Sequence, residues 1–346
     1  MNKKKNKVSG LAIAAIIIAV VIFNGVVIFL DLKNNKKKDG LVTGKTTEKT
    51  TEIVTEEPDT TTEVTTEVTT EATTTEEPTT EEQHDMLKGI REEFPEYSVE
   101  EQEKVLYIYQ NMHLYSTTLI NILHKNHETL DFVYNYPEDH LKAVDNDISA
   151  EVWEAKNGII PLFLQWDKRW GYMELGDGIM ANNGCGPTCL SMVVTYLTKS
   201  KDYSPAVMAK YAMDEEYYVD GHGTAWSMMS SGCEDFGVRA YELGLSELSM
   251  AEALEKGDPI IACVSEGDFT DGGHFIVITG YKDGQFSVND PYSVINTQKK
   301  WDYNRLAPQI SGLWAFYRDL SLSTEDFNSE ESLETTEENT EETTER

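Results

Sequence analysis

The sequence has few cysteines and a small share of basic residues. Four cysteines in 346 residues are too few for a disulfide-stapled scaffold. Only 29 lysines and arginines stand against 61 aspartates and glutamates, which gives a formal net charge of −32. Binding to nucleic acid requires a basic surface, and docking on anionic lipid through charge requires one too. The composition therefore argues against both kinds of partner.

Long apolar runs are also scarce, and the one that stands out lies near the amino terminus. Leu11 to Leu30 is a run of twenty residues in which Asn24 is the only strongly polar one. Twenty helical residues span about 30 Å, the thickness of the hydrocarbon core of a bilayer. A cleaved signal peptide would have a shorter apolar core, followed by a small-residue cleavage site. We predict an uncleaved transmembrane signal anchor over residues 11–31.

Two segments lack the apolar residues that a folded core needs. Residues 32–83 are rich in threonine and glutamate and repeat TTE-like units, and residues 319–346 have a similar composition. Such chains bury too little surface to offset their conformational entropy, so we expect a disordered linker and a disordered acidic tail. A long Thr/Glu spacer is typical of the outside of a cell. We therefore expect residues 1–10 to be cytoplasmic and the rest of this cell-membrane protein to be extracytoplasmic.

Two segments between the linker and the tail have foldable patterns. Residues 84–150 read as helical, and Ser98 followed by Glu101 forms a capping box at the start of one helix. Residues 158–318 read as an α+β domain, in which helices are followed by an antiparallel meander. The expected helices of this domain are 187–197, 205–212, 224–236 and 247–256. The expected strands are 238–243, 260–264, 274–281, 285–288 and 313–317.

The stretch Asn183–Met192, NGCGPTCLSM, carries the first chemical signal. Glycines bracket Cys185, and Pro187 suits the first turn of a helix. Apolar residues then recur at helical spacing, so Cys185 is expected at a helix amino terminus. The free N–H groups and the dipole there favour a thiolate and can help to hold an oxyanion. The alternative is a small buried cysteine that merely precedes a helix.

A histidine and an aspartate complete a possible triad. His274 opens an apolar strand directly after two glycines, and Asp290 ends the next strand. If the two strands pair, the carboxylate of Asp290 can orient the imidazole of His274, which can take the proton of Cys185. A strand-edge histidine and a turn-forming Asp-Pro are the alternatives to this interpretation.

These motifs together resemble the papain-like cysteine peptidases, in particular the double-glycine or bacteriocin-leader peptidases of cysteine peptidase family thirty-nine. The resemblance covers about 160 of the 346 residues. It rests on QWDKRWG at 165–171, GCGPTCLSM at 184–192, GHFIVITGY at 273–281, NDP at 289–291 and the closing LWAFYR. It implies a papain-like fold with a helical half and an antiparallel sheet. The chain differs from true leader peptidases because it has no transporter segments.

The resemblance also implies roles for four residues. It makes Cys185 the nucleophile, His274 the general base, Asp290 the orienting acid and Gln165 the oxyanion-hole donor. Gln165 lies twenty residues before Cys185, which is farther than is usual in papain-like enzymes, so an intervening loop is expected. Asn182 or Asn183 is the alternative donor. No cofactor and no metal ion are expected.

The function we predict from the sequence is that of a membrane-anchored, extracytoplasmic cysteine peptidase displayed on a cell surface. It would hydrolyse peptide bonds of peptide or protein substrates through an acyl-enzyme. One alternative is a peptidoglycan amidase or endopeptidase that acts on cell-wall peptides. The other is a non-catalytic surface binding module with a vestigial triad.

Overall fold

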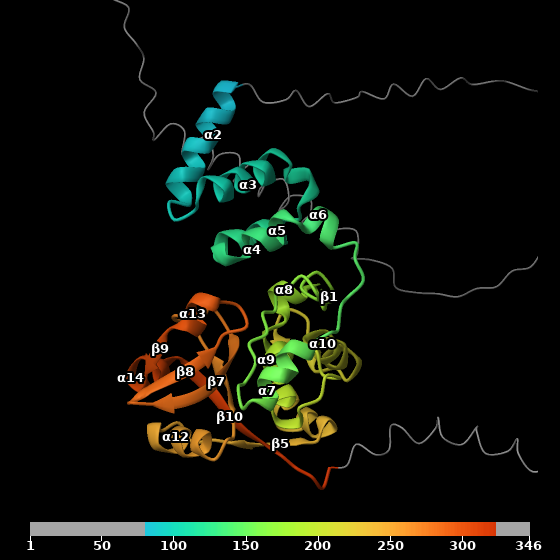
Figure 1. The fold of residues 1–346 in the computed structure, drawn as a ribbon, viewed down its shortest axis with the longest axis vertical. Helices are drawn as coiled ribbons and strands as arrows, with labels where there is room; N and C mark the ends of the chain where they lie inside the picture. Colours follow the sequence, from blue (N-terminus) through green and yellow to red (C-terminus); the bar gives the residue numbers. More distant parts are fainter. Residues whose placement is uncertain (1–79, 323–346) are drawn as a thin grey trace, which may run out of the picture. The chain divides into compact units, whose positions relative to one another are not determined.

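The computed structural model describes residues 80–322 (Figure 1). The predicted basic end 1–10, the predicted membrane span 11–31 and almost all of the linker 32–83 lie outside these residues, as does the tail from residue 323. Helix α2 begins at Thr80, so the prediction of a disordered linker up to residue 83 is wrong at its end. Among the helices of residues 80–322, none combines the length and the apolar character that a membrane span requires.

Residues 80–142 form a helical module. Its helices are α2 (Thr80–Glu93), α3 (Val99–Gln110), α4 (Thr117–Lys125), α5 (Leu130–Tyr134) and α6 (Tyr136–Asp139), with 3-10 turns at Met112–Leu114 and His127–Thr129. The predicted capping box is confirmed, because Glu101 N donates to Ser98 Oγ and Ser98 N donates to a carboxylate oxygen of Glu101. Its buried core includes Phe94, Val105, Ile108, Leu119, Ile122 and Leu123.

Two histidines, one in the last turn of α4 and one just after it, contact glutamates. His124 Nδ1 lies 2.9 Å from a carboxylate oxygen of Glu93, and His127 Nδ1 contacts a carboxylate oxygen of Glu96. Phe94 lies between these pairs, with ring centroids 6.2 Å from His124 and 4.5 Å from His127. His124 is thus tied to the last residue of α2, and His127 is tied to the turn between α2 and α3. These two contacts set the position of residues 125–128 within the helical module.

Residues 148–322 form the α+β domain, whose centre is a six-stranded antiparallel sheet. The strand order is β5-β10-β6-β7-β8-β9. The strands are β5 (Val238–Glu242), β6 (Ile260–Val264), β7 (His274–Lys282), β8 (Gln285–Asn289), β9 (Lys300–Asp302) and β10 (Ile310–Arg318). Two small hairpins pair β1 (Glu174–Leu175) with β2 (Gly178–Ile179), and β3 (Tyr218–Val219) with β4 (Gly223–Thr224).

The predicted meander is only partly right. Strands β6 to β9 follow one another in the sheet, but β10 lies between β5 and β6. Residues 313–316 of β10 are buried on both faces of the sheet, whereas β5 is mostly half-exposed. A strand that is apolar on both faces gains most from a central place. The last strand therefore occupies the middle of the sheet and leaves β5 at an edge.

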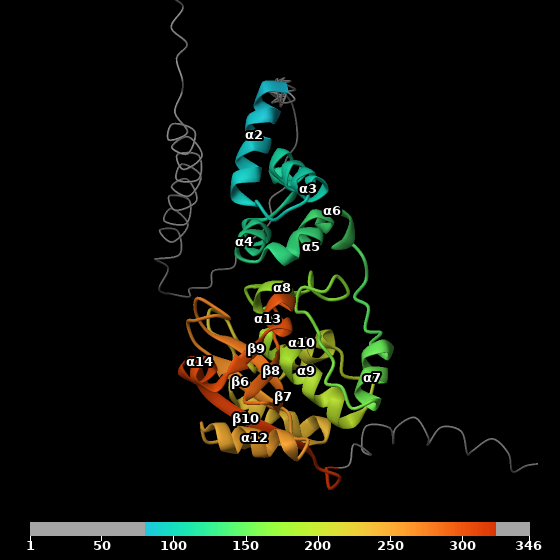
Figure 2. The ribbon, with the colours of Figure 1, turned by 60° about the vertical axis from the view of Figure 1, so that its left-hand side comes forward.

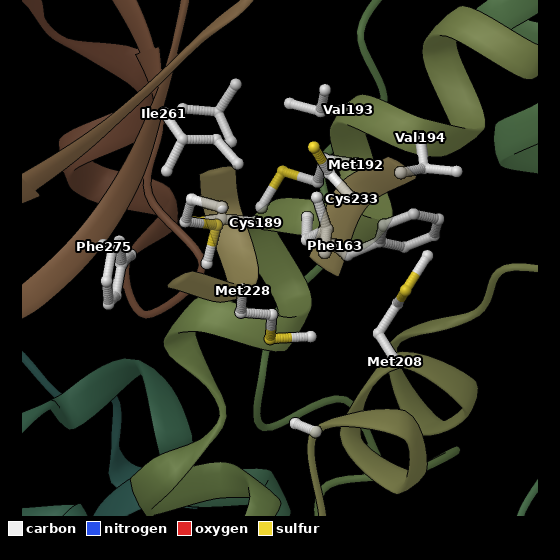
Figure 3. Packing of buried hydrophobic residues seen from close by; sticks show 14 of the residues in the cluster. Phe163, Cys189, Met192, Val193, Val194, Met208, Met228, Cys233, Ile261 and Phe275 are labelled. Carbon is white, nitrogen blue, oxygen red and sulfur yellow. The ribbon is translucent and has the colours of Figure 1, made fainter. Parts of the chain in front are cut away.

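Side-chain alternation along the strands divides the domain into two apolar layers. Ile261, Val277 and Phe316 point into one core, while Ile260, Ile276 and Ala315 point into the other. The first core contains α9 (Cys185–Thr198) and α10 (Pro205–Asp214), and Figure 3 shows Cys189 and Met192 of α9 near Ile261. The second core contains α12 (Glu247–Glu255), which runs along the opposite face of the sheet (Figure 2).

Helix α9 is more deeply buried than its sequence suggested. We expected one apolar face, but every residue from Gly186 to Thr195 is buried. The helix packs against the sheet, against α10 and against α7 (Ser149–Lys156), whose Val152 belongs to the same core together with Ile148. A helix covered on all sides has no polar face to present to solvent. The core of the α+β domain thus begins before residue 158.

The predicted helix 224–236 is wrong as a continuous element. Thr224 ends strand β4, and the rest is divided between α11 (Ser227–Ser230) and a 3-10 helix over Gly232–Phe236. Serines and a glycine at 230–232 interrupt the apolar spacing, and these residues favour turns over helix interiors. The remaining short elements are α8 (Met180–Asn183), α13 (Val294–Gln298), α14 (Tyr303–Leu306) and a 3-10 turn at Ala307–Gln309.

Candidate active site

Cys185 is the first residue of α9, as the sequence predicted. The N-cap residue is Gly184, which offers no side chain to the free N–H groups of the first helical turn. Cys185 is half-buried, while the three other cysteines of the chain are buried, and all four are free thiols. The helix amino terminus thus presents one partly accessible sulfur.

The surroundings of this sulfur favour its anionic form. Burial raises the pKa of the Cys185 thiol, but the His274 side chain and the backbone N–H groups of Phe275 and Gly186 lower it by more. The net pKa lies below the ordinary 9.0. Hydrogen bonds and a nearby positive charge are the usual causes of a reactive thiolate.

Strand pairing brings His274 and Asp290 together. His274 begins β7, and Asp290 directly follows the end of β8, its antiparallel neighbour. The His274 Nε2 atom lies 2.8 Å from Asp290 Oδ1, and both side chains are buried. This contact has the geometry of a regular hydrogen bond, and His274 lines the same cleft as Cys185.

The imidazole is strongly basic in this setting. Burial lowers the pKa of His274, but the Asp290 carboxylate raises it by more, with a smaller contribution from Cys185, and the resulting pKa is about 10. The thiol pKa moves down while the imidazole pKa moves up. At a pH between these two pKa values, the favoured state is a thiolate on Cys185 beside an imidazolium on His274.

The segment after β8 fixes the carboxylate of Asp290. Its Oδ1 atom also accepts the backbone N–H of Tyr292 at 2.9 Å, and its Oδ2 atom accepts Asn296 Nδ2 at 3.0 Å. The backbone N–H of Asp290 donates to Thr297 Oγ1 at 2.9 Å. A buried charge is tolerated when its lone pairs are satisfied in this way. These hydrogen bonds orient the Asp290 side chain toward His274.

Gln165 reaches the same cleft in spite of its distance in sequence. The intervening residues form the β1–β2 hairpin and α8, which supply the loop that the sequence required. Gln165 Nε2 donates to Ala181 O at 2.8 Å, and its backbone N–H donates to Pro291 O at 2.8 Å. Within residues 80–322, its buried Oε1 atom has no hydrogen-bond partner. Gln165 lines the same cleft as Cys185, and its amide has a second N–H besides the one that donates to Ala181 O.

The two asparagines named as alternatives to Gln165 differ in position. Asn182 lines the cleft with Gln165 and Cys185, and its Nδ2 atom donates to Asn183 Oδ1. Asn183 instead donates to Leu175 O and Asp177 Oδ1, so its amide belongs to the β1–β2 hairpin. Of the two, only Asn182 is placed to meet a ligand.

The cleft has a volume of about 340 Å³ and a mainly polar lining. Its walls contain Cys185, Gln165, His274 and Asp290 together with the 267–273 loop and residues 292, 293 and 296. Lys125 and Asn126 of the helical module also line it, which no sequence pattern indicated. Among residues 80–322, no group of three His, Cys, Asp or Glu side chains is arranged to hold a metal ion.

Two glycines of the site differ in what a side chain would meet. A Cβ on Gly186 would lie 2.6 Å from Thr224 Cβ, whereas a Cβ on Gly273 would meet nothing within 4 Å. We expect Gly186→Ala to lower the free energy of unfolding by about 1–3 kcal/mol, since Thr224 and the start of α9 must separate. Gly273→Ala should change it by less than about 0.5 kcal/mol. Urea denaturation followed by fluorescence measures both, and equal losses would contradict this account.

Comparisons with known proteins concern the α+β domain. Residues 159–321 match the model of the Peptidase_C39 like family. No curated protein matches the chain. The peptidase domain of Streptococcus ComA, a bi-functional ABC transporter involved in quorum sensing, is 19% identical with a TM-score of 0.31, and the match covers 39% of this chain and 90% of that one. A structure described as a C39-like peptidase of Bacillus anthracis is 15% identical with a TM-score of 0.30, over 46% and 96% of the two chains. By this match, the α+β domain of the chain is similar to the C39-like peptidases.

Proposed function

We propose that the chain is a cysteine peptidase of papain-like fold that hydrolyses peptide bonds through an acyl-enzyme on Cys185. The observation that carries this proposal is the meeting of three groups in one cleft. A thiol of lowered pKa lies beside a histidine of raised pKa, and this histidine is hydrogen-bonded to a buried aspartate. The match of residues 159–321 to the model of the Peptidase_C39 like family supports the same activity.

The geometry suggests the following steps. The Cys185 thiolate attacks the carbonyl carbon of the scissile bond, and the negative charge moves to the carbonyl oxygen. The free N–H of Gln165 and the N–H groups at the start of α9 stabilise this oxyanion. The His274 imidazolium gives its proton to the leaving amine. The now neutral ring then takes a proton from water, whose oxygen attacks the thioester and releases the acid and the thiol.

Selective alkylation tests the central part of the proposal. Burial raises the pKa of Cys189, Cys233 and Cys263, to about 12 for Cys233, whereas the pKa of Cys185 is lowered. We expect iodoacetamide to modify Cys185 in the native protein at least about 10-fold faster than the other three thiols at pH 7. Mass spectrometry of quenched samples gives the four rates. Equal rates, or a Cys185 midpoint at or above pH 9, would argue against a thiolate nucleophile.

We also propose that residues 11–31 anchor the chain in the cell membrane with the peptidase domain outside. The support is the twenty-residue apolar run and the acidic, threonine-rich spacer that follows it. In the natural host, the full-length chain should stay with membranes after alkaline carbonate extraction. Protease added to intact cells should digest the domain. Release by carbonate, or protection of the domain in intact cells, would refute the anchor or its orientation.

A further inference from the structure

The helical module and the α+β domain are joined by hydrogen bonds next to the candidate site. Asn126 Nδ2 donates to Tyr292 O. The Glu128 carboxylate accepts the backbone N–H groups of Val294 at 2.8 Å and of Ile295 at 3.2 Å, and it also accepts Ser293 Oγ. These contacts join residues that are more than 160 positions apart in the chain. They fall on the segment that immediately follows Asp290.

Glu128 completes the start of helix α13. The first N–H groups of a helix have no partner within it, and a side chain or water must satisfy them. Ser293 Oγ accepts the backbone N–H of Asn296 at 3.1 Å, and Glu128 accepts those of Val294 and Ile295. Hydrogen bonds to a carboxylate are shorter and stronger than those between neutral groups. A residue of the helical module thus holds this short helix in place.

Helix α13 in turn holds the triad aspartate. Asn296 Nδ2 donates to Asp290 Oδ2 at 3.0 Å, and Thr297 Oγ1 accepts the backbone N–H of Asp290 at 2.9 Å. Asp290 Oδ1 lies 2.8 Å from His274 Nε2. A continuous series of contacts therefore leads from Glu128 through α13 to the imidazole. A shift of α13 would change the partner of Asp290 Oδ2 and the partner of the Asp290 backbone N–H.

We propose that Glu128 is a positioning residue for the Asp290–His274 pair, and that the helical module is a working part of the active site. This inference rests on the proposed function of the cleft and adds a residue outside the family match, which begins at residue 159. Glu128 touches none of the triad side chains. It acts by fixing the helix that orients the Asp290 carboxylate. Its loss should therefore make the protonated form of His274 less favourable, and with it the thiolate form of Cys185.

The test is the pH dependence of Cys185 alkylation by iodoacetamide in Glu128→Gln and Glu128→Ala. We expect the Cys185 midpoint to rise by about one pH unit in Glu128→Ala, which is a tenfold smaller thiolate fraction below the midpoint. The rise should be smaller in Glu128→Gln, which keeps one acceptor oxygen. Glu103→Gln removes the same charge from an exposed position of the module and should leave the midpoint unchanged.

A double variant checks the route. If Glu128 acts through α13, the midpoint of Glu128→Ala with Asn296→Ala should equal that of Asn296→Ala alone. A purely structural role would lower the thermal unfolding midpoint without moving the alkylation midpoint, and would refute the inference. Additive shifts, or wild-type midpoints in both Glu128 variants, would refute it too while leaving the proposed function intact. An ordinary thiol midpoint at Cys185 in the wild-type protein would overturn both.

Discussion

Cys185→Ala is expected to reduce peptide hydrolysis to the background rate, a loss on the order of 10⁵-fold. In the proposed mechanism the sulfur of Cys185 bonds to the substrate, and alanine leaves no nucleophile at the start of α9. The remaining groups of the cleft still bind substrate and polarise its carbonyl, but they form no acyl-enzyme. Hydrolysis of a fluorescently labelled denatured protein measures this loss, with the full chain in detergent micelles.

Cys233→Ala is the matched control. Cys233 lies in the 3-10 helix over Gly232–Phe236, in the core beneath α9 and outside the residues that line the cleft. We expect this variant to keep its activity while it loses about 1 kcal/mol of stability from the small cavity. Residual hydrolysis by Cys185→Ala above a buffer control, or equal losses in both variants, would remove Cys185 as the nucleophile.

The sequence predicted those parts of the site that depend on local structure. The glycines around Cys185 and the apolar residues after it place this residue at a helix start, where the structure has it. The apolar strand that begins at His274 and the strand that ends before Asp290 are neighbours in a tight hairpin, so they pair. Antiparallel pairing then brings the two side chains together. In both cases a short stretch of sequence determines the geometry.

Contacts between distant segments could not be predicted in this way. Glu128 lies on a turn of the helical module, and its sequence context is that of an exposed acidic residue. In the structure, however, its carboxylate accepts N–H groups at the start of a helix more than 160 residues later. Lys125 and Asn126, which line the cleft, belong to the same segment of the helical module as Glu128. Docking of one folded unit on another leaves no periodicity in either segment. The central place of β10 follows from burial on both faces, and local patterns do not define strand order.

Asp290→Asn is expected to lower kcat/KM by about 10²- to 10⁴-fold while keeping the volume of the side chain. The carboxylate of Asp290 accepts donors on both oxygens, from His274 and Tyr292 on one and from Asn296 on the other. An amide nitrogen on either side would face a donor. The substitution therefore removes the charge that stabilises the imidazolium and forces a rearrangement of its partners. Asp290→Ala is less informative, because an unpaired buried histidine costs about 3–5 kcal/mol.

The pH profile separates loss of this charge from general damage. In the wild-type protein the imidazolium should persist until the pH passes about 10, so the alkaline limb of kcat/KM lies there. In Asp290→Asn the pKa of His274 loses its main raising influence, and the alkaline limb should move to lower pH. The stability that the pair contributes is complete below pH 6.5 and is lost as the pH rises through about 10. The thermal midpoint of the wild type should therefore fall across that range more steeply than that of Asp290→Asn. An unmoved alkaline limb would show that Asp290 does not set the charge of the imidazole.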